Sequence, residues 1–159
     1  MRIEVDDEGL AAKLRLAAYL QADHFLSVWR TLADTLGPDP AMVLIVLTIN
    51  SASIQRALRG AGDDAAPPHG QAIEAHHFKP ISRRAIAQAT GLSRETVRRK
   101  VRKLIEAGVV VEDGQGVKSM NVMADPRAAQ AVLQMSRDQV RLANRLLAEG
   151  VLRPRPDAV

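Results

Sequence analysis

Apolar residues recur at helical spacing in two long stretches, one towards each end of the chain. The stripe in residues 10–36 consists of Leu10, Leu14, Ala17, Phe25, Val28 and Leu32. The stripe in residues 126–149 consists of Ala128, Val132, Met135, Leu142 and Leu146. A period of three to four residues is typical of an amphipathic helix, so both stretches are predicted to be long helices. Gly150 is expected to end the second helix, and residues 153–159 are expected to form a frayed tail.

A further helix is predicted over residues 40–59. The Gly-Pro pair at 37–38 breaks the first helix, Asp39 offers a cap, and Pro40 suits the first helical position. Residues 41–49 are almost wholly apolar, so the start of this helix is expected to be buried on all sides. Two explanations stay open, the centre of a helical core and a subunit interface. We expect a mixture, with the core as the larger share.

Residues 82–108 have the pattern of two short helices joined by a tight turn. Ser82 and Ser93 stand where the two helices would be capped, and Gly91 stands where the chain must reverse. The residues expected to face inwards are Ile86, Ala87, Leu92, Val97, Val101, Leu104 and Ile105. Gly108 is expected to end the second helix.

A short β-hairpin is predicted directly after this helix pair. The valine run at 109–111 favours a strand, residues 112–116 favour a turn, and residues 117–122 can return as the second strand. Only Lys118 is basic near the tip, whereas Glu112 and its neighbour are acidic. The hairpin is therefore expected to be a poor phosphate clamp.

The second of the two short helices opens with a recognisable motif. It begins Ser93, Arg94, Glu95, Thr96, Val97 and continues with Arg99. With these residues, the segment 82–99 resembles the helix-turn-helix of the Crp–Fnr class of bacterial regulators. The stretch 78–122 is also similar to winged-helix regulators of the MarR and GntR families, and the long flanking helices resemble the MarR layout. The resemblance implies a mainly α fold with a small β-hairpin wing, in which long N- and C-terminal helices flank a winged helix-turn-helix.

The resemblance also implies that the recognition helix 93–107 lies in the major groove of double-stranded DNA. The residues that would read bases are Arg94, Glu95 and Arg99. Arginine can donate two bonds to guanine O6 and N7, and glutamate can accept one from cytosine N4. The residues expected to contact phosphates are Ser82, Arg83, Arg84, Thr96, Arg98 and Lys103. Lys100 stands where relatives have a small or aliphatic residue, and its stem is expected to cover apolar surface while its ammonium reaches solvent.

Charge is unevenly distributed along the chain, whose net charge is +4. Residues 79–107 contain nine basic side chains and two acidic ones, a net charge of +7, which leaves −3 for the rest. A basic patch on an otherwise acidic chain is typical of a nucleic-acid binder. Basic runs on helices are often only a solvated face, but this run coincides with the helix-turn-helix pattern.

Composition and motifs argue against several classes of function. The chain has no cysteine, which excludes disulfides, thiolate metal sites and cysteine redox sensing. Residues 1–8 lack the apolar run of a signal peptide, and the nine apolar residues at 41–49 are too few to cross a bilayer. We expect a cytoplasmic, nucleoid-associated protein with no membrane partner. No P-loop, GxGxxG after a strand, HExxH or GxSxG is found, so neither catalysis nor a cofactor is expected.

Two further kinds of site have only weak candidates. The residues with metal-binding side chains are His69, His76, His77, Asp63, Asp64 and Glu74. Polar residues on a solvated loop are the simpler interpretation, so no metal is expected. Tyr19, Phe25 and Trp29 could line a small-molecule effector pocket, but such residues more often belong to a core or an interface.

Four parts are predicted along the chain. They are an N-terminal helical region for core and dimerisation at 1–59, a flexible loop at 60–77, the winged helix-turn-helix at 78–122, and a C-terminal helix with tail at 123–159. The leading hypothesis is a sequence-specific transcriptional regulator that acts as a homodimer, because two recognition helices can read two half-sites. The alternative is a winged-helix module for protein interaction or for replication or nucleoprotein assembly, although a module for protein interaction alone does not need this basic helix.

Overall fold

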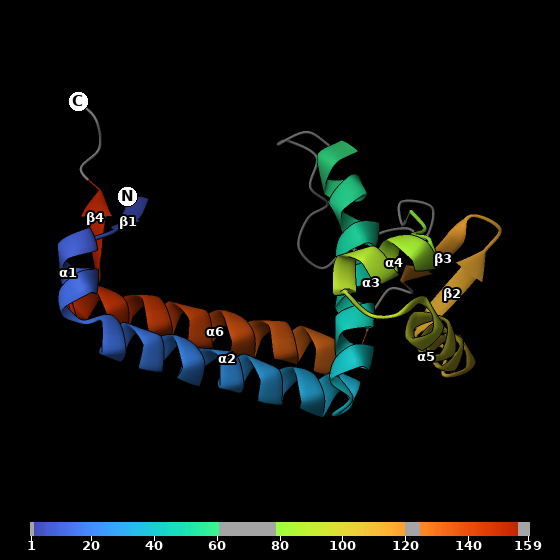
Figure 1. The fold of residues 1–159 in the computed structure, drawn as a ribbon, viewed down its shortest axis with the longest axis horizontal. Coiled ribbons are helices and arrows are strands. Elements are labelled where there is room, and N and C mark those ends of the chain that lie inside the picture. Colours follow the sequence, from blue (N-terminus) through green and yellow to red (C-terminus); the bar gives the residue numbers. More distant parts are fainter. Residues whose placement is uncertain (1, 61–78, 120–124, 156–159) are drawn as a thin grey trace. The chain divides into compact units, whose positions relative to one another are not determined.

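The computed structural model describes residues 2–60, 79–119 and 125–155. Within these residues the chain is mostly helical, with a small antiparallel hairpin after the helix-turn-helix (Figure 1), and this confirms the predicted fold class. The helices are α1 Asp7–Ala12, α2 Leu14–Leu36, α3 Pro40–Gly60, α4 Arg83–Thr90, α5 Arg94–Glu106 and α6 Pro126–Ala148. The strands are β1 Arg2–Val5, β2 Val110–Asp113, β3 Gly116–Ser119 and β4 Leu152–Arg155.

The chain divides into two compact units. The first, which we call the winged unit, is Thr35–Ala129, and the second, the terminal unit, combines Met1–Asp34 with Gln130–Val159. The winged unit thus includes α3 as well as the helix-turn-helix and the hairpin. The loop predicted at 60–77 lies outside the described residues, apart from Gly60 at the end of α3.

The core of the winged unit is built jointly by α3, α4, α5 and the hairpin. Its buried residues are Ile45, Val46, Ile49, Ile86, Ala87, Val97, Val101, Leu104, Val110 and Val117. The apolar run at 41–49 therefore supplies core residues. Leu44 and Leu47, however, are 46% and 37% exposed, so the expectation that this run is buried on all sides is wrong. The other elements of the unit pack against one side of α3 and leave these two side chains outside.

The helix pair α4–α5 starts and turns where the sequence predicts. Ser82 and Ser93 are the N-caps, and their hydroxyl oxygens accept bonds from the backbone N–H groups of Ala85 (3.2 Å) and Thr96 (3.1 Å). Gly91 ends α4 at φ = +70°, a left-handed conformation that costs glycine nothing sterically. These local signals fix the angle at which α5 leaves the turn.

The wing is joined to the start of the helix-turn-helix. Ile81, just before α4, exchanges two backbone hydrogen bonds with Val117 of β3, at 2.8 and 2.9 Å. Gly116 lies at φ = +150°, and a Cβ on it would come within 2.6 Å of the Ile81 carbonyl oxygen. The returning strand begins at Gly116, one residue earlier than predicted, and residues 120–122 of the prediction lie outside the described residues.

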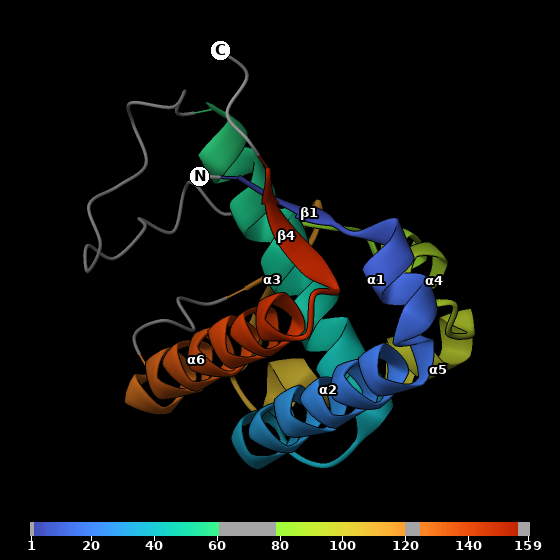
Figure 2. The same cartoon turned by 90° about the vertical axis from the view of Figure 1, so that its left-hand side faces the viewer.

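In the terminal unit, α2 and α6 lie side by side and antiparallel (Figures 1 and 2). Their contact buries Ala17 and Leu20 of α2 with Leu146 at the end of α6 and Val151 beyond it. The prediction of one continuous helix from residue 10 is wrong. Asp6 caps a separate short helix, α1, and the backbone at Lys13 (φ −121°, ψ 26°) leaves the helical region before α2 begins.

A second contact between α2 and α6 is polar. The Ser27 hydroxyl donates to the buried carboxylate of Asp138 at 2.9 Å. The same carboxylate accepts bonds from Gln134 and Arg141, both at 3.1 Å. These bonds, that of Ser27 first, lower the pKa of Asp138 below its usual value, so the group stays ionised where it is buried.

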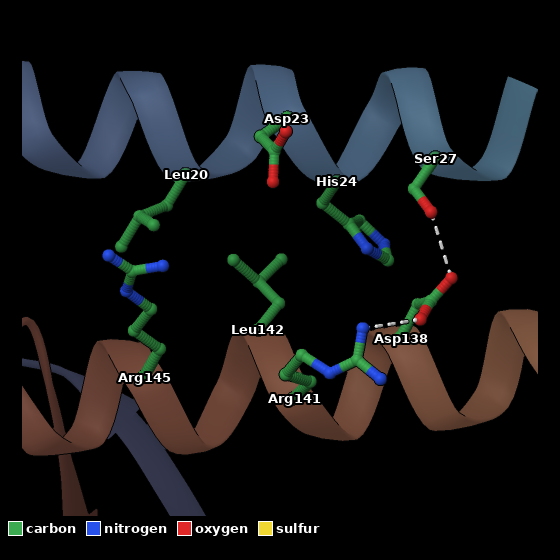
Figure 3. A pocket seen from close by; sticks show the side chains of 8 residues that line it. All are labelled: Leu20, Asp23, His24, Ser27, Asp138, Arg141, Leu142 and Arg145. Carbon is green, nitrogen blue, oxygen red and sulfur yellow. Dashed lines mark hydrogen bonds and ion pairs between the residues drawn. The ribbon is translucent and has the colours of Figure 1, made fainter.

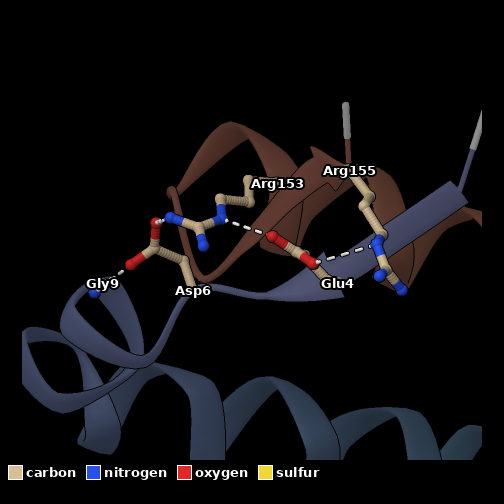
Figure 4. A network of polar contacts seen from close by, with 5 residues as sticks. All are labelled: Glu4, Asp6, Gly9, Arg153 and Arg155. Carbon is tan, nitrogen blue, oxygen red and sulfur yellow. Dashed lines mark hydrogen bonds and ion pairs between the residues drawn. The ribbon is translucent and has the colours of Figure 1, made fainter. Parts of the chain in front are cut away.

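The two ends of the chain pair as a β-ribbon, so the expectation of a frayed tail is wrong for residues 153–155. β1 and β4 are antiparallel, and the guanidinium of Arg153 binds both Glu4 (2.9 Å) and Asp6 (3.2 Å) (Figure 4). The pKa of Asp6 is lowered mainly by the bond from the Gly9 backbone N–H, and further by Arg153. Backbone pairing and these ion pairs hold the segment, and residues 156–159 of the predicted tail lie outside the described residues.

Candidate nucleic-acid interface

Helix α5 turns one face to the core and the opposite face to solvent. Val97, Val101 and Leu104 are buried. The exposed ionisable side chains are Arg94, Glu95, Arg98, Arg99, Arg102, Lys103 and Glu106. We call the first six of these the basic face of α5. Its excess of positive charge suits it to the phosphates and groove edges of a nucleic acid.

The three predicted base-reading residues all lie on this basic face. Arg94 and Arg99 are exposed and form no ion pair with any residue that the structure describes. Glu95 is held by Arg98 through two bonds, Nη2 to Oε1 at 2.7 Å and Nε to Oε2 at 2.8 Å. This pair lowers the pKa of Glu95 and raises that of Arg98. The Glu95 carboxylate therefore stays ionised and can accept hydrogen bonds. Arg98 must break its two bonds to Glu95 before its whole guanidinium can bind a phosphate.

Arg83 and Arg84, at the start of α4, have different surroundings. Both terminal nitrogens of Arg83 bind the Glu112 carboxylate on the wing, with Nη2 to Oε2 at 2.9 Å. Its Nε is buried without a hydrogen-bond partner among the described residues. Arg84 is exposed and unpaired within the same part of the chain. Arg84 is thus free for an anion, whereas Arg83 joins α4 to the wing.

The remaining predicted phosphate contacts are at helix starts or on the outer face. Ser82 is exposed as the cap of α4, and Thr96 shares a 2.9 Å hydroxyl contact with the α5 cap, Ser93. Lys103 is exposed. Both capping serines, Ser82 and Ser93, are exposed, and the N-terminus of a helix favours phosphate oxygens.

Lys100 differs from its expected role. Only 12% of the side chain is exposed, and its ammonium, expected in solvent, binds the carboxylate of Asp39. Asp39 also accepts the N–H groups of Ala41 (3.1 Å) and Met42 (3.3 Å) at the start of α3. The bond from Lys100 is the main cause of a lowered pKa at Asp39. Lys100 therefore joins α5 to α3 and is not part of the basic face.

The prediction from the sequence missed two residues of this region, Arg102 and Glu112. Arg102 is exposed on the basic face, three residues after Arg99, and is unpaired within the described residues. The spacing of three residues that places both on one face was the available signal. The role of Glu112 as partner of Arg83 had no local signal, because the two are 29 residues apart.

The described residues of the wing carry no net positive charge, because Lys118 is outnumbered by Glu112 and Asp113. Lys118, its one basic residue, binds Asp113 at 3.2 Å. The pKa of Asp113 is lowered mainly by the bond from the Gln115 backbone N–H and next by Lys118. Because Glu112 is also engaged by Arg83, the wing offers a phosphate no unpaired cation among its described residues.

A family model described as winged helix-turn-helix DNA-binding matches residues 79–111. The matched segment contains Ile81, both helices of the pair, and the start of β2, and covers about a fifth of the chain. Domains of this kind bind DNA and are typically not enzymes. No curated protein and no solved structure matches the chain.

The terminal unit has a small cavity between α2 and α6 (Figure 3). Its lining includes Asp23, His24, Asp138, Arg141 and Arg145, and its volume is about 90 Å³. The aromatic residues predicted to line an effector pocket, Tyr19, Phe25 and Trp29, are not among the residues that line it.

The described residues contain no group of three His, Asp or Glu side chains that could hold a metal. The residues named in the sequence as weak metal candidates all lie outside the described part of the chain, namely His69, His76, His77, Asp63, Asp64 and Glu74. No single described helix is long and apolar enough to cross a membrane, and α2 with the first part of α3 meets that test only as a bent pair.

Proposed function

We propose that this protein is a sequence-specific regulator of transcription that places α5 in the major groove of double-stranded DNA. The observation that carries the proposal is the basic face of α5. Arg94 and Arg99 stand there without an acidic partner in the described residues, on a helix whose opposite side is fixed in the core. A rigid helix with free arginines meets the geometric need of base readout.

The assignment of base contacts to Arg94, Glu95 and Arg99 rests on resemblance to the Crp–Fnr recognition helix together with their exposure. In this proposal each arginine donates to guanine, and Glu95 accepts from cytosine. Arg98 supports this role because it keeps the Glu95 carboxylate oriented while both are free of DNA.

The proposed phosphate contacts set the register of the helix on the duplex. They are Ser82, Arg83, Arg84, Thr96, Arg98 and Lys103. Arg84 and Lys103 can bind at once, whereas Arg83 and Arg98 would exchange a carboxylate for a phosphate. We expect Arg83 and Arg98 to contribute less to DNA affinity, because each must first give up its ion pair with a carboxylate.

The proposed regulator acts as a homodimer on the bacterial nucleoid, in the cytoplasm. One recognition helix offers few base contacts, and a two-fold pair reads two half-sites about 10–10.5 bp, or a multiple of that, apart.

Selection from a pool of random duplexes, followed by sequencing, tests the proposal. The wild-type protein should enrich a two-fold symmetric site. Arg94→Ala and Arg99→Ala should each cost about 1–3 kcal/mol on that site and relax the preference at one base pair per half-site. Arg127→Ala, which removes an exposed arginine outside the basic face that is paired with Asp125, is the control and should keep the consensus. Enrichment of no sequence, or an unchanged consensus in both α5 variants, contradicts the proposal.

A further inference from the structure

The terminal unit exposes more large apolar side chains than its core cluster buries. In the described residues the exposed ones of this unit are Ile3, Val5, Leu14, Tyr19, Phe25, Leu26, Val132, Leu133 and Val140. The buried members of its core cluster are Ala17, Leu20, Leu146 and Val151. A surplus of exposed apolar surface marks an interaction site.

Both long helices of the unit carry a second stripe, distinct from the residues that join them. On α2 the stripe is Leu14, Ala18, Gln21, Phe25, Val28 and Leu32. On α6 it is Ala129, Leu133, Ser136, Val140, Ala143 and Leu147. The steps alternate between four and three residues, which is the heptad spacing of helices that pack along a seam. Every side chain in both stripes is exposed or only half-buried.

The two stripes emerge on the same face of the α2–α6 pair. At 100° per residue, the stripe on α2 lies somewhat more than a quarter of a turn, and the stripe on α6 about two fifths of a turn, from the contact line between the helices. Both rotations run in the same sense from N- to C-terminus, and because the helices are antiparallel, this brings both stripes to one side. The opposite side carries Asp23, Arg141 and Arg145 around the cavity of Figure 3. The face defined by the two stripes, which we call the apolar face, therefore carries no charged residue of the stripes. The opposite side, which we call the charged side, carries these three charged residues together with the exposed side chains of Tyr19 and Leu26.

We propose that the apolar face of α2–α6 packs against the same face of a second copy of this chain, about a two-fold axis. Neither stripe contains a charged residue, so two copies meet without repulsion between like charges. The bulky Phe25 of one copy finds small residues, such as Ala18 and Ala143, to pack against. The proposed dimer does not require DNA binding; only its consequence, a second recognition helix, rests on the DNA-binding proposal.

The size of the face suits a stable dimer. Phe25 is 68% exposed, and Leu14, Leu133 and Val140 are all more than half exposed. Together with the smaller stripe residues they offer on the order of 700 Å² of accessible surface, against about 800 Å² per partner in a standard interface.

Light scattering on the full chain tests the proposal, with a variant that changes the stripe and one that does not. Wild type should show twice the 17.3 kDa mass of one chain. Phe25→Glu should halve that mass at the same micromolar concentration. Tyr19→Glu is the matched control, because Tyr19 is an aromatic residue of the same helix, 62% exposed, outside the stripe, and should stay dimeric. Both substitutions remove little buried surface, and circular dichroism reports whether each variant is folded.

A crosslink gives an independent readout, because the chain has no cysteine of its own. Gln21→Cys places a thiol in the stripe, and Arg30→Cys places one towards the charged side of α2. A short bismaleimide should join two copies of the first variant and not of the second.

A monomeric wild type, a dimeric Phe25→Glu, or equal crosslinking of both cysteine variants overturns the proposed interface. If the monomer still binds duplex DNA, the DNA-binding proposal survives that result. A dimer that binds no duplex leaves this interface standing and contradicts the function.

Discussion

The ammonium of Lys100 lies against Asp39, 61 residues earlier in the chain, and so differs from the other basic residues of α5. One oxygen of that carboxylate caps α3 and the other holds α5. The cap was predictable, because the Asp-Pro pair is a local signal. The ion pair was not, because no local pattern brings α3 beside α5.

Replacing Lys100 with methionine should separate this structural role from DNA contact. Lys100→Met should lower the free energy of unfolding by about 1 kcal/mol at neutral pH. The expected loss is modest because the side chain of Lys100 is largely buried but that of Asp39 is about half exposed. The pKa of Asp39 is lower in the folded protein than in the unfolded chain. The ion pair therefore contributes fully to stability at pH values above the pKa of the unfolded chain, and this contribution is lost as the pH falls through the pKa of the folded protein. Urea unfolding at several pH values should therefore show wild type and variant converging in acid.

Lys103→Met is the control, because Lys103 is on the same helix but exposed. It should leave stability nearly unchanged and reduce the dependence of DNA affinity on salt, whereas Lys100→Met should leave that dependence intact. A stability difference that persists unchanged in acid, after the Asp39 carboxylate has been protonated in the folded protein, would refute the role given to the Lys100–Asp39 pair.

Among the elements, those with local signals were predicted best. Ser82, Gly91 and Ser93 define α4 and α5 by capping and turning, and both helices occur where these residues place them. The break at Lys13 was missed, because apolar periodicity continues across it. The contribution of Ile81 to the wing sheet was missed too, since it depends on pairing with a strand 36 residues later.

Gly116 offers a test of how firmly the wing is joined to the helix-turn-helix. Gly116→Ala should destabilise the protein by about 2 kcal/mol, because it combines a positive φ with a Cβ 2.6 Å from the Ile81 carbonyl oxygen. Gly114→Ala, in the same turn, should cost less, because nothing lies within 4 Å of a Cβ there and its φ is not in the left-handed region. Thermal unfolding followed by circular dichroism compares the two, and equal melting temperatures would contradict the described contact.

At the scale of the whole chain, the sequence predicted its helical character and the basic segment. It did not predict that α3 completes the core of the winged unit. An entirely apolar run indicates that a helix is buried, but it does not indicate which elements pack against that helix. Nor did it predict the β1–β4 ribbon, in which Arg2 pairs with Arg155 across nearly the full length of the chain. The predicted DNA contacts and the homodimer stay predictions, now tied to described surfaces.

The central claim is that the basic face of α5 contacts double-stranded DNA, and amide NMR on the ¹⁵N-labelled protein tests it most directly. On addition of the selected duplex, the largest shift changes should fall on Arg94, Glu95 and Arg99 and on the start of α4. Amides of α6 near Val140 should change little. If the duplex produced no changes at low salt, or changes confined to the terminal unit, α5 would not be the DNA-binding element.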